Sequence, residues 1–513
     1  MTQEIELKLS VPAQDAARLW RTQALSSWPR SKPVSRRLFS AYYDTPMRDL
    51  ARRGMALRLR REGGRWIQTI KGGGQVMSGL HVRNEFDTEV PAQLVSFPAL
   101  IEAGLADLVD NAAFRQALGV VFTTNFSRVT SITEPASGDR IEVSLDRGEV
   151  ICGERHEELC EIELELRTGN AARLFDLATA LAGELSLRLD NVSKAERGYR
   201  LAEATGPRPV KAAAIALRKE MSVDAAFQAI LSGCLRHLQA NERGVLDSND
   251  PEYIHQARVA IRRMRCTFGL FHPAIPKSLF ADSLAWLKQT GATLGAARDW
   301  DVFCTGLLAK APSSVDAGTH APAGNIRQRA AAKRGLARKR AKALLADPGF
   351  TQRSLEFSRL LVEGAWTRER DAAHAEAAAM PLPEYAAKLL LRRSQKVLKR
   401  GSELQRNDPA SLHALRIQIK KLRYAFEFFA ALFGRKSAKR YLSRLEDLQE
   451  ILGELNDTAT AHRLLDALAT RASDSTGQLA VGFLRGYAAA AADARLGELE
   501  NTWERFEKAD SFW

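Results

Sequence analysis

The chain divides into two parts with different hydrophobic periodicities. In residues 1–203, polar and apolar residues alternate with a period of two in several segments, including Glu4–Leu9 and Glu161–Leu166. Such alternation is typical of strands. Two helical patterns, near residues 12–25 and 170–185, interrupt the strands, and the glycines at 72–74 predict a turn. From about residue 220 the chain becomes rich in Ala, Leu and Arg at helical spacing, which predicts an all-α part.

A Gly-Pro-Arg-Pro segment at 206–209 predicts a linker between the two parts. We therefore expect three regions, namely an N-terminal domain at 1–203, a linker at 204–217 and a helical domain at 218–508. Within the helical domain, Asp250-Pro251 and Asp408-Pro409 predict helix starts, because proline is favoured in the first turn of a helix.

The helical part repeats itself at an offset of 158 residues. Residues 249–265 and 407–423 share seven identities in 17 aligned positions. Asp299 matches Asp457 at the same offset. A fixed offset held over separate segments indicates an internal duplication. We expect two similar helical bundles, in about residues 218–345 and 352–505.

Charge is distributed unevenly along the chain. The net charge is +14, yet residues 1–205 hold 27 basic and 28 acidic residues, so the remainder carries +15. Such asymmetry suggests that the helical part meets a polyanion, although a basic surface without a dedicated ligand is the alternative. Five cysteines without a CxxC pair argue against disulfides and structural zinc. Neither a membrane-spanning run nor a signal-peptide pattern is present, which predicts a cytoplasmic protein without a membrane partner.

The predicted strands carry unusually dense charged faces of mixed sign. These faces could simply be solvated on the outside of a sheet. Alternatively, the sheet closes into a barrel and the charged faces surround a wet lumen. Arg and Lys in such a lumen would hold the oxygens of a polyphosphate. Glutamates there would hold a hard divalent cation, Mg²⁺ or Mn²⁺, since carboxylates alone would repel the substrate.

Seven motifs occur in a fixed order over the first 200 residues. They are Glu4-x-Glu6-x-Lys8, Tyr42–Pro46, Ala56–Arg60, Lys71 in a Thr-Ile-Lys-Gly context, Arg83-x-Glu85, Glu161–Leu166 and Ser193–Tyr199. In this order they resemble the CYTH family of triphosphate tunnel metalloenzymes. The resemblance implies an eight-stranded antiparallel β-barrel tunnel with flanking helices. Together with the duplicated helical domain, this predicts an α+β multidomain protein.

The resemblance also implies roles for individual residues. Glu4, Glu6 and Lys8 would be catalytic. The implied metal ligands are Glu4, Glu6, Glu163 and Glu165; the implied triphosphate-binding residues are Lys8, Arg58, Arg60, Lys71, Arg83, Arg128 and Lys194; and Glu85 and Glu142 would orient these bases.

Two basic stripes mark the helical part. His255, Arg258, Arg262 and Arg265 fall on one helical stripe, which His413, Arg416, Lys420 and Arg423 repeat. Like charges so close repel one another, which favours a bound anion, while a solvated or internally paired face is the alternative. Together with the adjacent Arg263 and Lys421, the repeated pattern resembles the CHAD family. That resemblance implies that these ten residues bind inorganic polyphosphate and that the protein associates with polyphosphate granules.

These features predict an inorganic triphosphatase, a phosphoanhydride hydrolase that uses Mg²⁺ or Mn²⁺ to convert triphosphate to pyrophosphate and phosphate. One alternative is a non-catalytic, granule-associated protein that binds polyphosphate. Another is a nucleotide, RNA or thiamine triphosphatase. Nucleic acid is disfavoured as a partner, because the basic stripes contain few aromatic residues and no nucleic-acid-binding motif is present.

Overall fold

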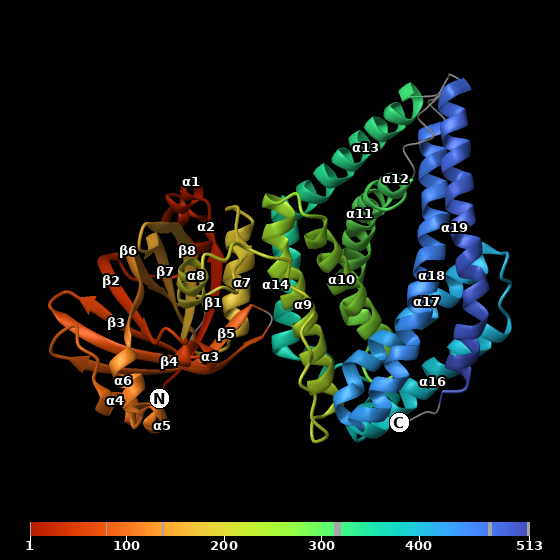
Figure 1. Cartoon of the computed structure of the whole chain (residues 1–513). Coiled ribbons are helices and arrows are strands. Elements are labelled where there is room, and N and C mark those ends of the chain that lie inside the picture. The colour runs from red at the N-terminus through yellow and green to blue at the C-terminus, as the bar shows by residue number, and fades with distance from the viewer. Residues whose placement is uncertain (1, 78, 136–137, 312–319, 470–474, 510–512) are drawn as a thin grey trace. The chain divides into compact units, whose positions relative to one another are not determined.

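The computed structural model describes residues 2–77, 79–135, 138–311, 320–469, 475–509 and 513. The chain forms two compact units (Figure 1). The barrel unit comprises Met1–Arg208 and Asp347–Gly364. The helical unit comprises Pro209–Ala346 and Ala365–Trp513.

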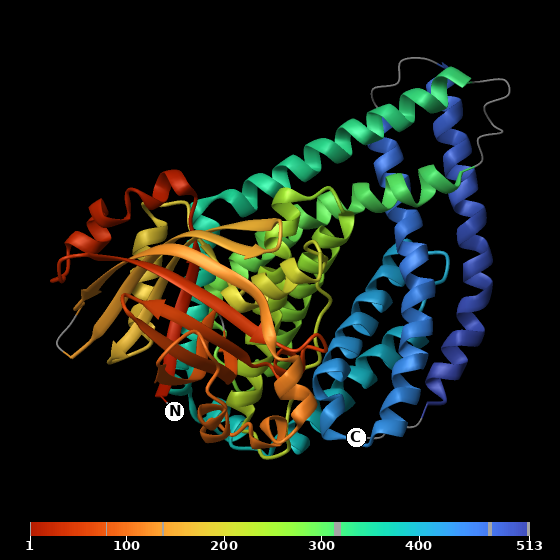
Figure 2. The same cartoon turned by 60° about the vertical axis from the view of Figure 1, so that its left-hand side comes forward.

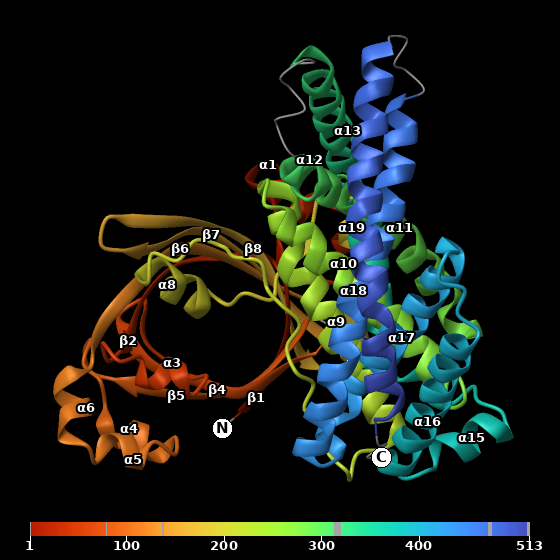
Figure 3. The same cartoon turned by 45° about the vertical axis from the view of Figure 1, so that its right-hand side comes forward.

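A closed antiparallel barrel forms the centre of the barrel unit (Figure 3). Its strand order is β5-β4-β3-β2-β6-β7-β8-β1, and pairing of β1 with β5 closes the ring, while β9 pairs with β1 at the rim. This confirms the predicted eight-stranded barrel. The strands are β1 (Thr2–Ser10), β2 (Val34–Asp44), β3 (Ala56–Glu62), β4 (Arg65–Met77), β5 (Leu80–Val90), β6 (Gly119–Thr133), β7 (Arg140–Cys152), β8 (Arg155–Thr168) and β9 (Arg188–Leu189).

The period-two alternation separates an apolar exterior from a charged interior. On β1, Leu7 and Leu9 are fully buried in the core outside the barrel, while Glu6 and Lys8 line the interior cavity. Strands β7 and β8 follow the same pattern. Because a slip of one residue would exchange the two faces, the outward apolar residues also fix which charges point inward.

Helices complete the barrel unit. They are α1 (Ala13–Ala16), α2 (Gln23–Ser26), α3 (Asp49–Arg52), α4 (Phe97–Glu102), α5 (Ala106–Val109), α6 (Ala112–Ala117), α7 (Ala172–Ala182), α8 (Lys194–Ala202) and α14 (Pro348–Glu363). The helical pattern near 12–25 therefore corresponds to short segments, and that near 170–185 corresponds to α7. The sequence analysis assigned residues 352–364 to the second helical repeat, yet α14 packs on α7 in the barrel unit.

The predicted turn at residues 72–74 is wrong. These glycines continue β4, whose pairing with β5 shifts register between Gly72 and Gln75. A Cβ atom at Gly74 would lie 2.2 Å from the Val82 carbonyl oxygen. The glycines therefore serve a bulge with close backbone approach, a role that turn statistics do not distinguish from a turn.

The helical unit contains only helices and connecting segments among its described residues. They are α9 (Val223–Asp247), α10 (Pro251–Phe271), α11 (Ala281–Thr305), α12 (Leu307–Lys310), α13 (His320–Ala346), α15 (Ala372–Ala378), α16 (Leu382–Ser402), α17 (Pro409–Phe429), α18 (Arg435–Ala469) and α19 (Ser475–Glu507). The long helices α18 and α19 run side by side (Figure 2). Throughout the described part of the chain, no helix has the length and apolar content needed to cross a membrane.

Helices α10 and α17 carry the two basic stripes and have matching boundaries. Each has 21 residues, and their first residues, Pro251 and Pro409, are 158 positions apart. The preceding aspartates cap both helices, since Asp250 accepts a hydrogen bond from the Glu252 amide and Asp408 from the Ala410 amide. The predicted helix starts are therefore confirmed.

Candidate active site and basic helices

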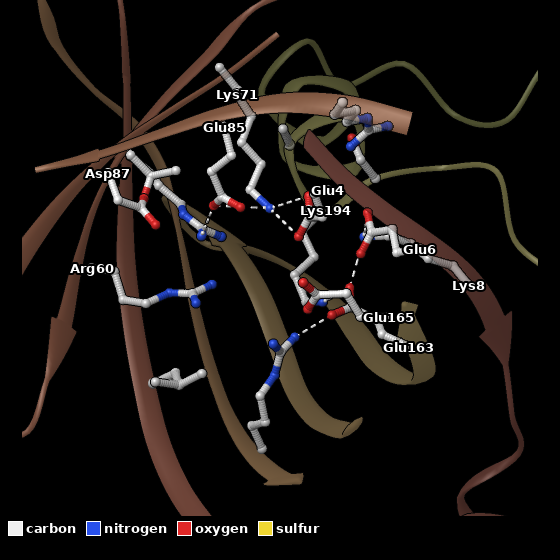
Figure 4. A pocket seen from close by; sticks show the side chains of 18 of the residues that line it. Glu4, Glu6, Lys8, Arg60, Lys71, Glu85, Asp87, Glu163, Glu165 and Lys194 are labelled. Atoms are coloured by element: carbon white, nitrogen blue, oxygen red, sulfur yellow. Dashed lines mark hydrogen bonds and ion pairs between the residues drawn. The ribbon is translucent and has the colours of Figure 1, made fainter. Parts of the chain in front are cut away.

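A cavity of about 980 Å³ lies inside the barrel. Every tunnel residue that the sequence analysis named lines it, from Glu4 on β1 to Lys194 on α8. Among the lining side chains labelled in Figure 4, Glu4, Lys71 and Glu85 are directed toward one another. Charged residues from separate strands therefore meet around a single space, as the hypothesis of a charged lumen requires.

Three carboxylates form a row across adjacent strands. Glu6 on β1 lies opposite Glu165 on β8, which lies opposite Glu142 on β7. We call these three residues the acidic row. Like charges directly opposite one another on neighbouring strands are destabilising. The row therefore has an electrostatic cost that a bound cation would remove.

The surroundings of Glu165 show that cost. Burial, with the charges of Glu4 and Glu142, raises the pKa of Glu165 to about 7 despite its ion pair with Arg167 at 2.6 Å. Carboxylate oxygens are the ligands that hard divalent cations prefer. The acidic row with Glu4 could therefore supply ligands to a divalent cation.

A second set of three carboxylates is already paired with basic side chains of the protein. Oxygens of Asp146, Glu161 and Glu163 lie within 4.8 Å of one another, a spacing at which they could hold a metal ion. However, the Lys194 ammonium group lies among them, 2.7 Å from Asp146 and 2.8 Å from Glu163. It also contacts Glu161. The site that a metal would take here is therefore occupied by an ammonium group.

Arg128 and Lys8 complete this group. Arg128 donates two hydrogen bonds to Asp146, at 2.7 and 2.6 Å, and also contacts Glu163. Lys8 donates to Glu163 at 2.8 Å. Three cations thus face three carboxylates, and we call these six residues the buried ion cluster.

The pKa values within the cluster reflect strong pairing. Burial opposes ionisation of Glu163, but the charges of Lys194 and Lys8 hold its pKa well below the ordinary value. The pKa of Asp146 is lowered, against burial, by Lys194 and Arg128. For Glu161 burial prevails, so its pKa is raised. Glu163 is therefore neutralised by neighbouring cations and differs in its surroundings from the acidic row.

The opposite wall of the cavity is basic. Burial and the charges of Arg58 and Arg128 lower the pKa of Arg60 to about 10. Arg36 on β2 lies opposite Arg128 on β6, which adds another pair of like charges. Excess positive charge on this wall faces the acidic row, an arrangement that fits phosphates and a metal ion together.

Acids and a histidine hold other basic side chains in place. Glu85 accepts a hydrogen bond from Arg58 at 3.2 Å and forms an ion pair with Lys71 at 3.2 Å. Glu142 instead pairs with Arg167 at 2.6 Å. Arg83 lies 2.9 Å from the Nδ1 atom of His81. Burial and the nearby Lys8 lower the pKa of His81 to about 3, so its neutral ring accepts this hydrogen bond.

The sequence analysis missed several lining or supporting residues. Asp146 and Glu161 support the cluster, while Arg36, Asp87 and Arg167 line the cavity. A signal for them was present, because Asp146, Glu161 and Asp87 continue the period-two series of neighbouring predicted residues. Extending each alternation to the end of its strand would have identified these three.

Two basic helices face each other in the helical unit. Burial, with the charges of Arg262 and Arg416, lowers the pKa of Lys420 to about 6. Arg258 and Arg262 come from α10, whereas Arg416 and Lys420 come from α17. We call these four residues the basic cluster. Its neighbouring acids include Asp299, 3.3 Å from Arg258, and Asp457, whose pKa burial raises.

The remaining predicted stripe residues have other surroundings. Arg263 and Arg423 form ion pairs with Glu427, at 3.2 and 2.8 Å. Arg265 and Lys421 lie in a second basic group, where burial followed by Arg393 and Lys396 lowers the pKa of Lys421. His255 lies beside the basic cluster, and burial with the Arg298 charge lowers its pKa to about 4, so it is neutral near pH 7. His413 contacts Asn456 at 2.7 Å.

Two family models match the chain. Residues 2–199 match the model of the CYTH domain, and residues 229–466 match that of the CHAD domain. Together they cover the strand-rich part and most of the helical part.

Known proteins resemble each part. The inorganic triphosphatase of Haemophilus influenzae is 35% identical to this chain over 202 residues. These residues make up 39% of this chain and 55% of that protein, so the chain spans about half the length of this curated relative. The CHAD domain structure from Ricinus communis is 32% identical, with a TM-score of 0.50, and covers 60% of this chain and all of that one. HpAC1 from Hippeastrum, described with a dominant triphosphatase activity, is 22% identical over 38% of this chain and 96% of that one, with a TM-score of 0.29.

Proposed function

Since this chain is a CYTH domain followed by a CHAD domain, we propose that its barrel unit hydrolyses inorganic triphosphate to pyrophosphate and phosphate, and that its helical unit binds inorganic polyphosphate. The observation that carries the first part is the acidic row facing a basic wall inside one closed barrel. The name of the Haemophilus influenzae relative supports the same activity.

Glu4 and the acidic row would hold Mg²⁺ or Mn²⁺. A divalent cation there neutralises phosphoryl charge and polarises the phosphorus that is attacked. Lys71, whose ammonium group lies 2.7 Å from Glu4, holds that carboxylate in place at the cavity. Glu163 lies on β8 with Glu165, but its oxygens face Lys8, Lys194 and Arg128. We therefore assign Glu163 to positioning these cations rather than to binding the metal.

Arg58, Arg60 and Arg83 would bind the phosphoryl oxygens, because guanidinium groups bind such oxygens in pairs. Glu85 holds Arg58 in place for this task. Lys8, Arg128 and Lys194 contribute fixed positive charge at the edge of the cavity, where the buried ion cluster restrains them. Preorganised charges of this kind stabilise negative charge that develops during phosphoryl transfer.

The aromatic lining favours a substrate without a base. Among the described cavity residues, Tyr42 and Tyr199 carry the aromatic rings. Tyr42 stacks on Phe122 with ring centroids 4.5 Å apart, and Arg48 lies over the Tyr199 ring. Since both rings are already engaged, stacking would not hold a nucleobase or a thiazole ring firmly. Inorganic triphosphate needs charge alone.

The basic cluster carries the proposal for polyphosphate. Burial, together with the charges of Arg262, Arg416 and Arg258 from the two helices, lowers the pKa of Lys420, and a bound anion would offset this effect. A chain of phosphates supplies closely spaced negative charge without bases. Binding such chains would bring the protein to polyphosphate granules in the cytoplasm, as fluorescence microscopy of the tagged chain would test.

Phosphate release tests the proposed hydrolysis. The purified chain is given inorganic triphosphate, ATP, thiamine triphosphate or long-chain polyphosphate with Mg²⁺, Mn²⁺ or EDTA. We expect metal-dependent release with a strong preference for inorganic triphosphate. Arg58→Ala should reduce kcat/KM about 100-fold. The control Arg65→Ala removes an exposed arginine from the neighbouring strand β4 and should leave activity unchanged. No release from any substrate by the parent chain would make the barrel a binding site instead.

Binding measurements test the helical unit separately. In the double variant Arg262→Glu/Lys420→Glu, polyphosphate affinity should fall about 100-fold or more, since attraction becomes repulsion at a partly buried site. Arg243→Glu, on the exposed side of α9, is the matched control. RNA of equal charge should compete poorly. Unchanged polyphosphate binding in the double variant would move the anion site elsewhere.

A further inference from the structure

Helix α14 lies in the middle of the segment matched by the CHAD model, yet it packs against the barrel unit. Figure 1 shows it beside α7. Thr351 donates a hydrogen bond to the Leu187 carbonyl oxygen at 2.8 Å, and Arg359 forms an ion pair with Asp176 at 2.9 Å. Polar contacts therefore anchor α14 near both of its ends.

Apolar contacts join α14 to the barrel core. Leu355 has no exposed surface and belongs to the same apolar cluster as Leu7, Leu9, Ile162 and Leu164 of the barrel wall. Helix α7 leaves Arg173 and Ala180 exposed and buries a wide apolar face, which includes Leu174, Phe175, Leu177, Ala178, Leu181 and Ala182. An apolar face of this width is covered by more than one neighbouring element. Strands of the barrel and helix α14 both pack against α7.

This layered packing reaches the candidate active site. Leu7 and Leu9 alternate along β1 with Glu6 and Lys8, which line the cavity. On β8, Leu164 lies between Glu163 and Glu165. Because inward and outward side chains alternate on one backbone, loosening the outer apolar layer displaces the inner charges. The strands in question are the two that carry most of the proposed metal ligands.

We infer that α14 is an integral part of the barrel unit, so that the triphosphatase activity of this unit depends on a helix supplied from within the helical region of the chain. The chain passes between the two units at residues 208–209, 346–347 and 364–365. Cutting the linker at 204–217 therefore leaves α14 attached to the remainder of the helical region. The catalytic part of this dependence rests on the function proposed above, whereas the structural part does not.

Cleavage of the intact protein tests this inference. A protease site is placed in the exposed linker near Lys211, and the purified full chain is cut there. We expect the two fragments to elute together on gel filtration and to keep their activity within twofold. Separation of the N-terminal fragment with full activity would overturn the inference.

Variants of α14 identify the contact that holds the fragments together. Leu355→Asp should separate the cut fragments, reduce triphosphatase activity at least tenfold and lower the unfolding midpoint of the barrel unit by about 5–15 °C. Arg353→Asp places the same new charge on the exposed side of α14 and should change none of these. If Leu355→Asp behaves like Arg353→Asp, α14 is dispensable.

Hydrogen exchange keeps the test independent of catalysis and of global unfolding. In uncut Leu355→Asp, amides of α7 should exchange faster while those of α10 keep their protection. The milder Leu355→Ala should give a smaller change in the same amides. If the parent chain hydrolyses no triphosphate, the proposed function fails, yet elution and exchange still decide the role of α14. Unchanged exchange in α7 would overturn that role.

Discussion

Asp146→Asn is the most direct test of the buried ion cluster. The substitution keeps the size of the side chain and removes one negative charge. Asp146 has no exposed surface, accepts two hydrogen bonds from Arg128 and contacts Lys194 at 2.7 Å. Once the charge is removed, an amide nitrogen or oxygen must face two cations that had a carboxylate between them.

The expected cost follows from burial. Breaking a buried ion pair by removing one partner costs about 3–5 kcal/mol, because the other charge stays buried without compensation. The free energy of unfolding of the barrel unit should fall by about that amount. For a unit of this size, the unfolding midpoint should then drop by about 6–20 °C. Arg128 also loses its bidentate anchor, so kcat/KM for triphosphate should fall at least about tenfold.

Hydrogen exchange of β7 and β8 amides measures the stability of the barrel unit within the full chain. Glu149→Gln is the control, since Glu149 lies on the same strand and pairs with His156 in an exposed position. That exposed pair should be worth under about 1 kcal/mol. A cost below about 1 kcal/mol for Asp146→Asn as well would refute the view that the cluster stabilises the barrel wall.

Three further outcomes are expected. A carboxyl group whose pKa is lowered in the folded protein contributes stability above its ordinary pKa, and this stability is lost on acidification. Because the pKa values of Asp146 and Glu163 are lowered, urea titrations should show that the barrel unit becomes less stable as pH falls below about 4. Glu161, whose pKa is raised, makes a smaller contribution of opposite sign. An anion stabilises charged Lys420, whose pKa is about 6 without it, so polyphosphate affinity measured by calorimetry should rise as pH falls from 8 to 6, and Lys420→Met should flatten this dependence. Gly198→Ala would place a methyl group 2.1 Å from the Phe122 ring, so it should displace α8, destabilise the unit by about 1–3 kcal/mol and reduce triphosphatase activity.

The sequence was sufficient to predict the barrel and which residues face its interior. Alternation assigns each side chain to a face, and the ordered motifs identify the closed sheet. The partners of those side chains could not be predicted in the same way. Lys194 is more than 30 residues from Glu161 and Asp146, and only closure of the barrel together with the position of α8 brings them into contact. The two-residue period predicts which face of the sheet a side chain lies on, but it does not predict which side chain it contacts across the lumen.

The helical part shows the same limit for a different reason. Helical spacing correctly placed both basic stripes, and the offset of 158 correctly matched α10 with α17. The stripes nevertheless separate into groups with different partners, since Arg263 pairs with Glu427 while Arg262 joins the basic cluster. Adjacent residues on a helix point about 100° apart, so a one-residue difference decides between an internal ion pair and a place in the basic cluster.

Charge balance differs between the buried ion cluster and the groups that we propose to bind ligands. The buried ion cluster matches three cations with three carboxylates, and its most strongly paired acid, Glu163, has a lowered pKa. The acidic row and the basic cluster lack this balance, and in each a buried group is shifted toward its neutral form, Glu165 in one and Lys420 in the other. Burial is the largest cause of both shifts, and neighbouring like charges add to it, namely Glu4 and Glu142 for Glu165 and Arg262 and Arg416 for Lys420. A cation relieves the first imbalance and an anion relieves the second. Because a phosphate chain with a divalent metal ion supplies both, we propose this one class of ligand for both units.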